Sequence, residues 1–145
     1  MMSGPATISA THWTKFPAGE WRWRNFTPRE MADRDTGYLV IVPHFMAWLQ
    51  GVREIYARPM VISSGYRAPL RQFELTGRRQ GAHVDGMAVD VLVSGEDAEL
   101  LERIAIQRGV LGRGVMQVGA HHKRYLHLDL WTKAPKGTRP ALWSY

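Results

Sequence analysis

Cysteine is absent from the 145-residue chain. Without thiols the protein forms no disulfide bond or thiolate zinc site, and it has no cysteine nucleophile. Any bound metal must therefore be held by histidine, aspartate or glutamate. Long apolar runs are missing too: the longest candidate, residues 38–42, stops at Pro43, far short of the roughly 20 residues of a membrane-spanning helix. We expect no membrane insertion.

The start of the chain lacks the pattern of a secretory leader. Residues 1–11 are small and polar, with no basic head followed by an apolar stretch, so we expect no signal peptide. We interpret residues 1–12 as a loose N-terminal arm. Residues 13–145 then form one domain, long enough to bury a core of its own. We expect this domain to be a monomer.

Positive charge is in excess, with 19 lysines and arginines against 13 acidic residues and a formal net charge of +6. Such a charge attracts anions, including nucleic acid, anionic lipid and the acidic polymers of a bacterial wall, or it serves solubility alone. Trp13, Trp21 and Trp23 are interleaved with basic residues, and such aromatic rings can stack on bases. We favour a simpler interpretation, in which these rings pack onto the core, and expect no nucleic-acid partner.

Hydrophobic periodicity predicts three helices. Thr-Pro-Arg-Glu at 27–30 is typical of a capped start, and it opens a short helix. Residues 43–58 place apolar side chains on one face at helical spacing. A third helix spans 94–109, where Ser and Asp three residues apart resemble a capping box and a glycine ends the helix.

Short β-rich segments follow or interrupt these helices. We predict strands over residues 60–63, 87–93, 115–118 and 124–131, and loop from there to Trp143. The combination predicts an α+β fold. It is a single domain with a small, mainly antiparallel sheet and helices packed on it.

Two predicted strands carry polar side chains on one face. Over residues 125–130 three leucines alternate with Tyr125, His127 and Asp129, so the polar side chains share the face opposite the leucines. Asp90 is the single carboxylate in an otherwise apolar strand. Burying such a charge is costly unless it is paired or bound to a metal.

His83 lies shortly before this carboxylate, and Gly86 permits a tight turn that returns His83 toward the Asp90 strand. Two histidines and one aspartate suit catalytic zinc, which keeps three protein ligands and leaves one position open. His83, Asp90 and His127 therefore predict a zinc site on the sheet. The same three residues could instead form a hydrogen-bonded structural network, and their spacing alone does not decide between the two.

Three motifs occur in a familiar order. They are Ser-Gly-Tyr-Arg at 64–67, His-x-x-Gly-x-Ala-x-Asp at 83–90 and Tyr-Leu-His-Leu-Asp at 125–129. In this order they resemble the zinc peptidases that include D-alanyl-D-alanine carboxypeptidases and the L-alanyl-D-glutamate endopeptidases of bacteriophage lysis. The resemblance runs over about residues 26–129. The terminal Arg-Pro-Ala-Leu-Trp-Ser-Tyr, 139–145, is also similar to tails of phage members.

The resemblance implies zinc bound by His83, Asp90 and His127. It implies hydrolysis of a peptide bond in the stem peptide of bacterial peptidoglycan, by endopeptidase or D,D-carboxypeptidase action. Arg67 matches the arginine that binds the substrate carbonyl oxygen or carboxylate, where a fixed guanidinium can stabilise an oxyanion. A phage or prophage lysin is implied as well. Such a protein stays in the cytoplasm until lysis releases it to the wall, or it is carried by the virion.

Two positions depart from the family pattern. Gly81 stands where serine is usual, which removes at most one hydrogen bond near the metal. Arg124 stands where many members carry an acidic general base, and arginine cannot accept a proton. This second departure supports an alternative, a non-catalytic zinc-containing module that binds cell wall or builds a virion.

A catalytic protein therefore needs another proton acceptor. We rank Asp129 first because its carboxylate shares a strand face with His127, although it could instead orient that ligand. His122 ranks second because imidazole titrates near neutral pH. His121 and Asp85 are further options.

Overall fold

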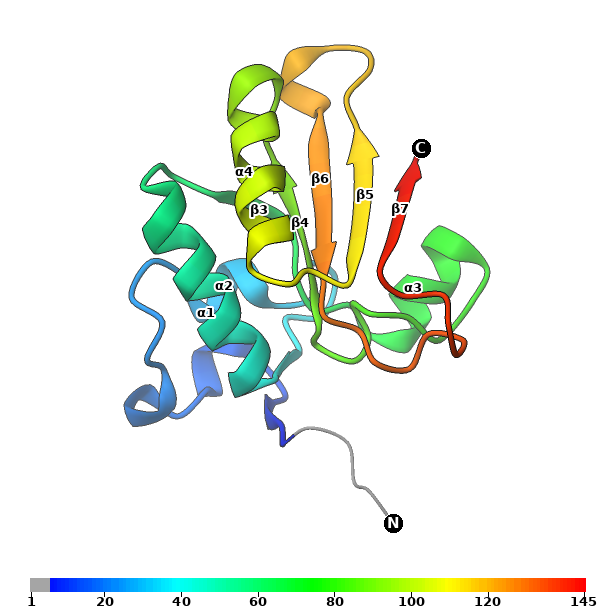
Figure 1. Cartoon of the computed structure of the whole chain (residues 1–145). Helices are drawn as coiled ribbons and strands as arrows, with labels where there is room; N and C mark the ends of the chain where they lie inside the picture. Colours follow the sequence, from blue (N-terminus) through cyan, green and yellow to red (C-terminus); the bar gives the residue numbers. More distant parts are fainter. Residues whose placement is uncertain (1–5) are drawn as a thin grey trace.

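A five-stranded sheet forms the centre of the protein (Figure 1). The structure, a computed structural model, describes residues 6–145. The strands of this sheet are β3 (Val61–Ser64), β4 (Ala88–Leu92), β5 (Gly112–Met116), β6 (Tyr125–Asp129) and β7 (Ala141–Ser144). Their order is β3-β4-β6-β5-β7, and all neighbours are antiparallel except β5 and β7, which are parallel. The predicted α+β fold with a mainly antiparallel sheet is confirmed.

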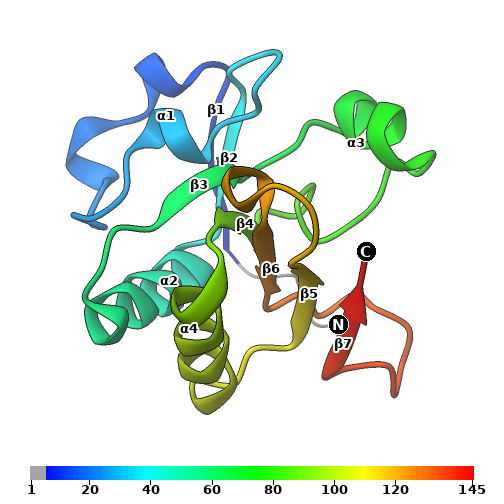
Figure 2. The same ribbon diagram turned by 90° about the horizontal axis from the view of Figure 1, so that it is seen from above.

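Helices lie on both sides of the sheet. They are α1 (Pro28–Met31), α2 (Pro43–Tyr56), α3 (Pro69–Thr76) and α4 (Gly95–Gln107), with short 3-10 turns η1 (Trp13–Lys15), η2 (Ala18–Glu20) and η3 (His121–Lys123). Seen from above, the sheet separates α2 and α4 from α3 (Figure 2). None of the described helices combines the length and apolarity needed to cross a bilayer.

The core lies between the sheet and the pair α2 and α4. Val89 and Val91 of β4 and Leu126 and Leu128 of β6 are almost completely buried there, with exposures of 0–1%. The predicted alternation in these two strands is therefore confirmed. Because alternate side chains point to opposite faces, the polar residues of both strands lie on the other face of the sheet.

Helix starts show which capping signals were informative. Thr27 forms the predicted capping box: its hydroxyl accepts a hydrogen bond from the Glu30 amide, and the Glu30 carboxylate accepts one from the Thr27 amide. Ser94 occupies the N-cap position of α4 but makes no side-chain capping bond. The capping box predicted there is wrong, because the Asp97 carboxylate pairs with Arg58 instead.

Three elements differ from their prediction. β5 begins at Gly112, three residues before the predicted start, because neighbouring side chains fill the space above its glycines. The tail predicted to be loop contains β7, which adds to the edge of β5. α3 was not predicted; it lies on the surface with only Gln72 buried, and its apolar side chains Leu70, Phe73 and Leu75 stay exposed.

The N-terminal segment is partly ordered against the domain. Residues 1–5 of the predicted arm lie outside the described residues. β1 (Ile8–Ala10) pairs antiparallel with β2 (Leu39–Ile41), so the loose arm is wrong over these residues. A strand forms here because β2 presents a free edge beside the core. The domain limits of 13–145 stay a prediction.

The tryptophan-rich segment packs against the core. Trp23 is 7% exposed, and the Trp21 indole donates a hydrogen bond of 2.8 Å to the Phe26 carbonyl. Trp13 is partly buried on the same cluster. These contacts agree with the ring-packing interpretation of the segment.

Gly65, directly after β3, lies against the end of α1. A Cβ at this position would lie 2.6 Å from the Met31 carbonyl oxygen and 2.8 Å from its Cα. We expect Gly65→Ala to lower the free energy of unfolding by about 1–3 kcal/mol, the usual cost of overpacking, measured by urea denaturation. Gly19→Ala is the matched control, since nothing lies within 4 Å of its Cβ. Equal stability of the two variants would contradict this packing.

Candidate metal centre

Two neighbouring strands place Asp90 and His127 side by side. Asp90 of β4 and His127 of β6 are direct partners in the antiparallel register. Both point to the face opposite α2 and α4, and they are only 7% and 6% exposed. A carboxylate and an imidazole are thus buried together on a rigid part of the sheet.

A tight turn brings His83 to the same place. The amides of Asp85, Gly86 and Met87 donate to the carbonyls of Gly81, His83 and Ala82, respectively, and Gly86 has a φ of 70° that favours glycine. His83 is 4% exposed. The turn places its imidazole against the strand pair, as the sequence led us to expect.

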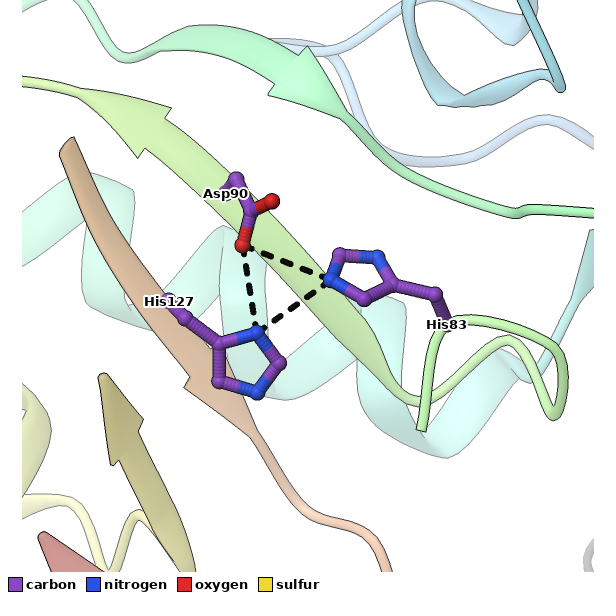
Figure 3. A group of neighbouring side chains, drawn as sticks. All are labelled: His83, Asp90 and His127. Carbon is purple, nitrogen blue, oxygen red and sulfur yellow. Dashed lines mark hydrogen bonds and ion pairs between the residues drawn. The ribbon is translucent and has the colours of Figure 1, made fainter. Parts of the chain in front are cut away.

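The three side chains converge on one point (Figure 3). His83 Nε2 lies 3.2 Å from His127 Nδ1 and 3.3 Å from Asp90 Oδ1, and His127 Nδ1 lies 3.1 Å from Asp90 Oδ1. Ligands bound tetrahedrally at zinc distances of about 2.0–2.1 Å lie about 3.3 Å apart. The triangle of donor atoms therefore has the dimensions of a zinc site.

Hydrogen bonds on the outer side of each imidazole decide which nitrogen carries the proton. His83 Nδ1 lies 2.7 Å from the Gly65 carbonyl oxygen, and His127 Nε2 lies 2.7 Å from Asp129 Oδ2. Because both oxygens only accept, each of these nitrogens donates a proton. In the neutral rings, His83 Nε2 and His127 Nδ1 then carry lone pairs. Together with Asp90 Oδ1 they place three acceptors within 3.3 Å, an arrangement that a cation satisfies.

The ionisation of these groups follows from burial and from one another. Burial lowers the pKa of His83 below its usual value, which keeps that ring neutral and able to bind a metal. Burial also opposes ionisation of Asp90, but charge attraction and hydrogen bonding from whichever imidazole is protonated outweigh burial and hold the pKa of this carboxyl well below its usual range. Asp90 is therefore an anion at neutral pH. For His127, hydrogen bonds to Asp129 and Asp90 outweigh burial and raise its pKa.

Asp129 lies behind the cluster. It is completely buried, and its Oδ2 accepts from His127 Nε2, the ring nitrogen opposite the one in the triangle. Its Oδ1 accepts from the Trp131 amide at 3.0 Å, and Arg139 Nη2 lies 3.4 Å from Oδ2. A Cβ at Gly112 would overlap this carboxylate. The geometry thus favours Asp129 orienting His127 over Asp129 accepting a proton from substrate.

Arg67 lies directly beside the cluster. Its Nη2 donates to Asp90 Oδ2 at 3.0 Å, its Nε to Ser64 Oγ at 3.0 Å and its Nη1 to Gln72 Oε1 at 3.1 Å. These bonds use three of the five guanidinium N–H groups. The remaining two have no hydrogen-bond partner among residues 6–145.

A cavity of about 490 Å³ opens onto the cluster and Arg67. Its other lining residues are Gln72, Leu75, Thr76, Ala82, Tyr125, Asp129, Trp131, Arg139, Trp143 and Tyr145. Burial, with Tyr145 and Asp90 nearby, raises the pKa of Tyr125 to about 12, so its hydroxyl stays protonated at neutral pH. Among the described residues that line the cavity, the only side-chain carboxylates are those of Asp90 and Asp129.

The structure does not bring the other predicted proton acceptors to this cavity. His122 and His121 are exposed on η3 and line a separate pocket beside Tyr56. Arg124 turns away and donates to the Gly119 carbonyl. Asp85 lies outside the cavity, and its carboxylate accepts a hydrogen bond of 2.8 Å from the Trp131 indole.

The tail supplies residues that the sequence did not mark as functional. Arg139, Trp143 and Tyr145 line the cavity, and the Trp143 ring lies 5.1 Å from that of His127. The resemblance of the tail to phage proteins was a signal at these positions. Without the parallel pairing of β7, however, nothing in the sequence placed them near the cluster.

Comparison with known proteins gives one match. A family model described as peptidase M15 matches residues 23–129, a span that contains the whole His83, Asp90 and His127 cluster. No curated protein and no solved structure matches the chain.

We expect the purified protein to bind one zinc ion per chain, as measured by elemental analysis. His83→Ala and His127→Ala should each lose the metal, because each removes one of three ligands. His44→Ala is the control and should keep it, since this histidine is exposed at the start of α2. Full zinc content in either ligand variant would refute the assignment.

Proposed function

The chain belongs to the peptidase M15 family, and on that basis we propose that it hydrolyses a peptide bond in the stem peptide of bacterial peptidoglycan, with zinc held by His83, Asp90 and His127. Members of this family are zinc-dependent metallopeptidases. The observation that carries the proposal is the triangle of three potential ligand atoms, one each from His83, Asp90 and His127, in the lining of a cavity. The net charge of +6 would favour contact with an anionic wall.

The ligands are prepared for metal by their outer hydrogen bonds. The Gly65 carbonyl holds the proton of His83 on Nδ1, and Asp129 holds that of His127 on Nε2. Such contacts fix the orientation of a ligand and raise its basicity. Bound zinc supplies Lewis acidity and lowers the pKa of a coordinated water to about 7. In this proposal Asp129 is a positioning residue.

Arg67 would bind the carbonyl oxygen of the scissile amide. Hydrogen bonds to Ser64, Gln72 and Asp90 hold its guanidinium in place before substrate arrives. A donor fixed in advance stabilises the negative charge that develops on that oxygen without a cost of reorganisation. The position of Arg67 beside the cluster supports this role.

A second candidate function follows from the proton acceptors. Both side-chain carboxylates among the described lining residues are engaged, Asp90 with the cluster and Asp129 with His127. Arg124 cannot replace them as a proton acceptor. This favours the alternative of a zinc-containing module that binds wall peptide or builds a virion without hydrolysing it. In either case we propose a phage or prophage origin, with release to the wall by lysis or transport in the virion.

Digestion of purified peptidoglycan separates the two functions. For a peptidase we expect new stem-peptide fragments in mass spectra, which also identify the bond that is cut. A chelator should abolish them, and added zinc should restore them. Intact peptidoglycan after incubation with fully zinc-loaded protein would contradict the enzymatic proposal and favour the binding module.

Replacement of Arg67 tests its role in turnover. We expect Arg67→Ala to retain zinc and to lower kcat by roughly 10²–10³, the usual cost of an oxyanion donor, measured on a peptide that the digestion identifies. Arg22→Ala controls for the loss of one positive charge, because Arg22 is exposed and does not line the cavity. Turnover close to that of the unaltered protein would remove Arg67 from the mechanism.

A further inference from the structure

The tail after β6 builds one wall of the cavity. It lies beyond residues 23–129, the part that the family model matches. β7 pairs with β5 in parallel and brings Trp143 across Gly114, where a Cβ would lie 2.6 Å from the indole nitrogen. Arg139 lies two residues before β7 and lines the same cavity as the metal cluster.

Arg139 lies between two aromatic rings. Its guanidinium carbon lies 5.7 Å from the ring centre of Trp131 and 5.3 Å from that of Trp143. Both distances are within the range of cation–π attraction. Contacts of this kind position the guanidinium without using its hydrogen-bond donors.

Most of these donors have no partner among the described residues. The one polar contact is that of Nη2 with Asp129 Oδ2, at 3.4 Å. The Nε has no partner but is buried, so the N–H groups that can meet a ligand are those of Nη1 and the second one of Nη2. Arg67, by contrast, already donates three hydrogen bonds to protein. Of the two arginines in the cavity, Arg139 thus has the greater capacity to bind a ligand.

The charges around Arg139 favour an anionic ligand. Asp129 is already shared between His127 and the Trp131 amide, so it neutralises Arg139 only in part. Two guanidinium groups and a divalent zinc ion would face two side-chain carboxylates in this cavity, so positive charge is in excess among these groups. A planar guanidinium with free N–H groups matches a carboxylate in both shape and charge.

We propose that Arg139 is a specificity-determining residue that binds a carboxylate of the peptide substrate. The proposal rests on the peptidase function given above and names the substrate feature that the cavity selects. Two sources supply this group in a stem peptide: the free C-terminus and the α-carboxylate of a γ-linked glutamate. Arg67 then binds the scissile carbonyl, and Arg139 fixes which residue lies beside it.

Four matched peptides test this selection on the zinc-loaded protein. They are one stem pentapeptide with both carboxylates, two in which either the C-terminal or the γ-linked glutamate carboxylate is an amide, and one with both as amides. Affinity is measured as Kd by calorimetry, or as KM for any peptide that is hydrolysed. We expect one of the two carboxylates to improve affinity roughly ten- to hundredfold over its amide, the range for a charge-assisted hydrogen bond. The two peptides with a single amide identify which carboxylate is bound.

Three variants assign the preference to Arg139. Arg139→Gln should bind all four peptides equally weakly, while Arg139→Lys should keep a reduced preference because it keeps the charge. Arg103→Gln, exposed on α4, removes one charge elsewhere and should behave as the unaltered protein does. If Arg139→Gln does not fold, as judged by its thermal transition, an unchanged preference in Arg139→Lys overturns the proposal, since a lysine cannot reproduce the stacked fork.

Failure of this inference is distinguishable from failure of the peptidase function. An unaltered protein without preference among the four peptides, or Arg139→Gln that retains the preference, overturns the role of Arg139 even when hydrolysis is observed. Carboxylate-selective binding that is lost in Arg139→Gln supports it even when no peptide is cut, in which case only the peptidase function is wrong.

Discussion

Antiparallel hydrogen bonds between β4 and β6 set Asp90 opposite His127, and the geometry of the metal centre depends on this register. A shift of either strand by one residue would turn its polar side chains into the core and its leucines or valines outward. The buried face of Val89, Val91, Leu126 and Leu128 opposes such a shift. Hydrophobic packing on one side of the sheet thus holds two ligands in place on the other.

A second layer of contacts determines how the cluster behaves. The Gly65 carbonyl and Asp129 direct the protons of the two imidazoles outward, so three lone pairs face one another across about 3 Å. Without a cation, this arrangement would be repulsive unless one ring took up a proton. The energetic cost of gathering acceptors in a buried place is offset when metal binds. This coupling explains why the backbone carbonyl of Gly65, 18 residues before His83, affects metal binding.

Periodicity in the sequence was sufficient to predict the strands that carry Asp90 and His127, and alternation was sufficient to put them on one face. His83 was harder, because a loop residue has no periodicity; only Gly86 and the family resemblance indicated its return to the sheet. The position of Arg139 and Trp143 could not be predicted. It depends on a parallel pairing between β5 and a short edge strand, and such long-range pairing leaves no local pattern. The predicted start of β5 was wrong for a related reason: glycines that appear to break a strand are tolerated where neighbouring side chains fill their space.

Gly112 shows this most clearly, since the Asp129 carboxylate occupies the volume where its side chain would be. In evolutionary terms, position 112 is not free to vary independently of position 129. Any larger residue there would displace the carboxylate that orients His127, so it would be tolerated only if Asp129 changed as well. Gly112 has no functional group of its own, yet it constrains the orientation of the ligand His127 through Asp129. Substitutions at positions 112 and 129 should therefore covary among homologues.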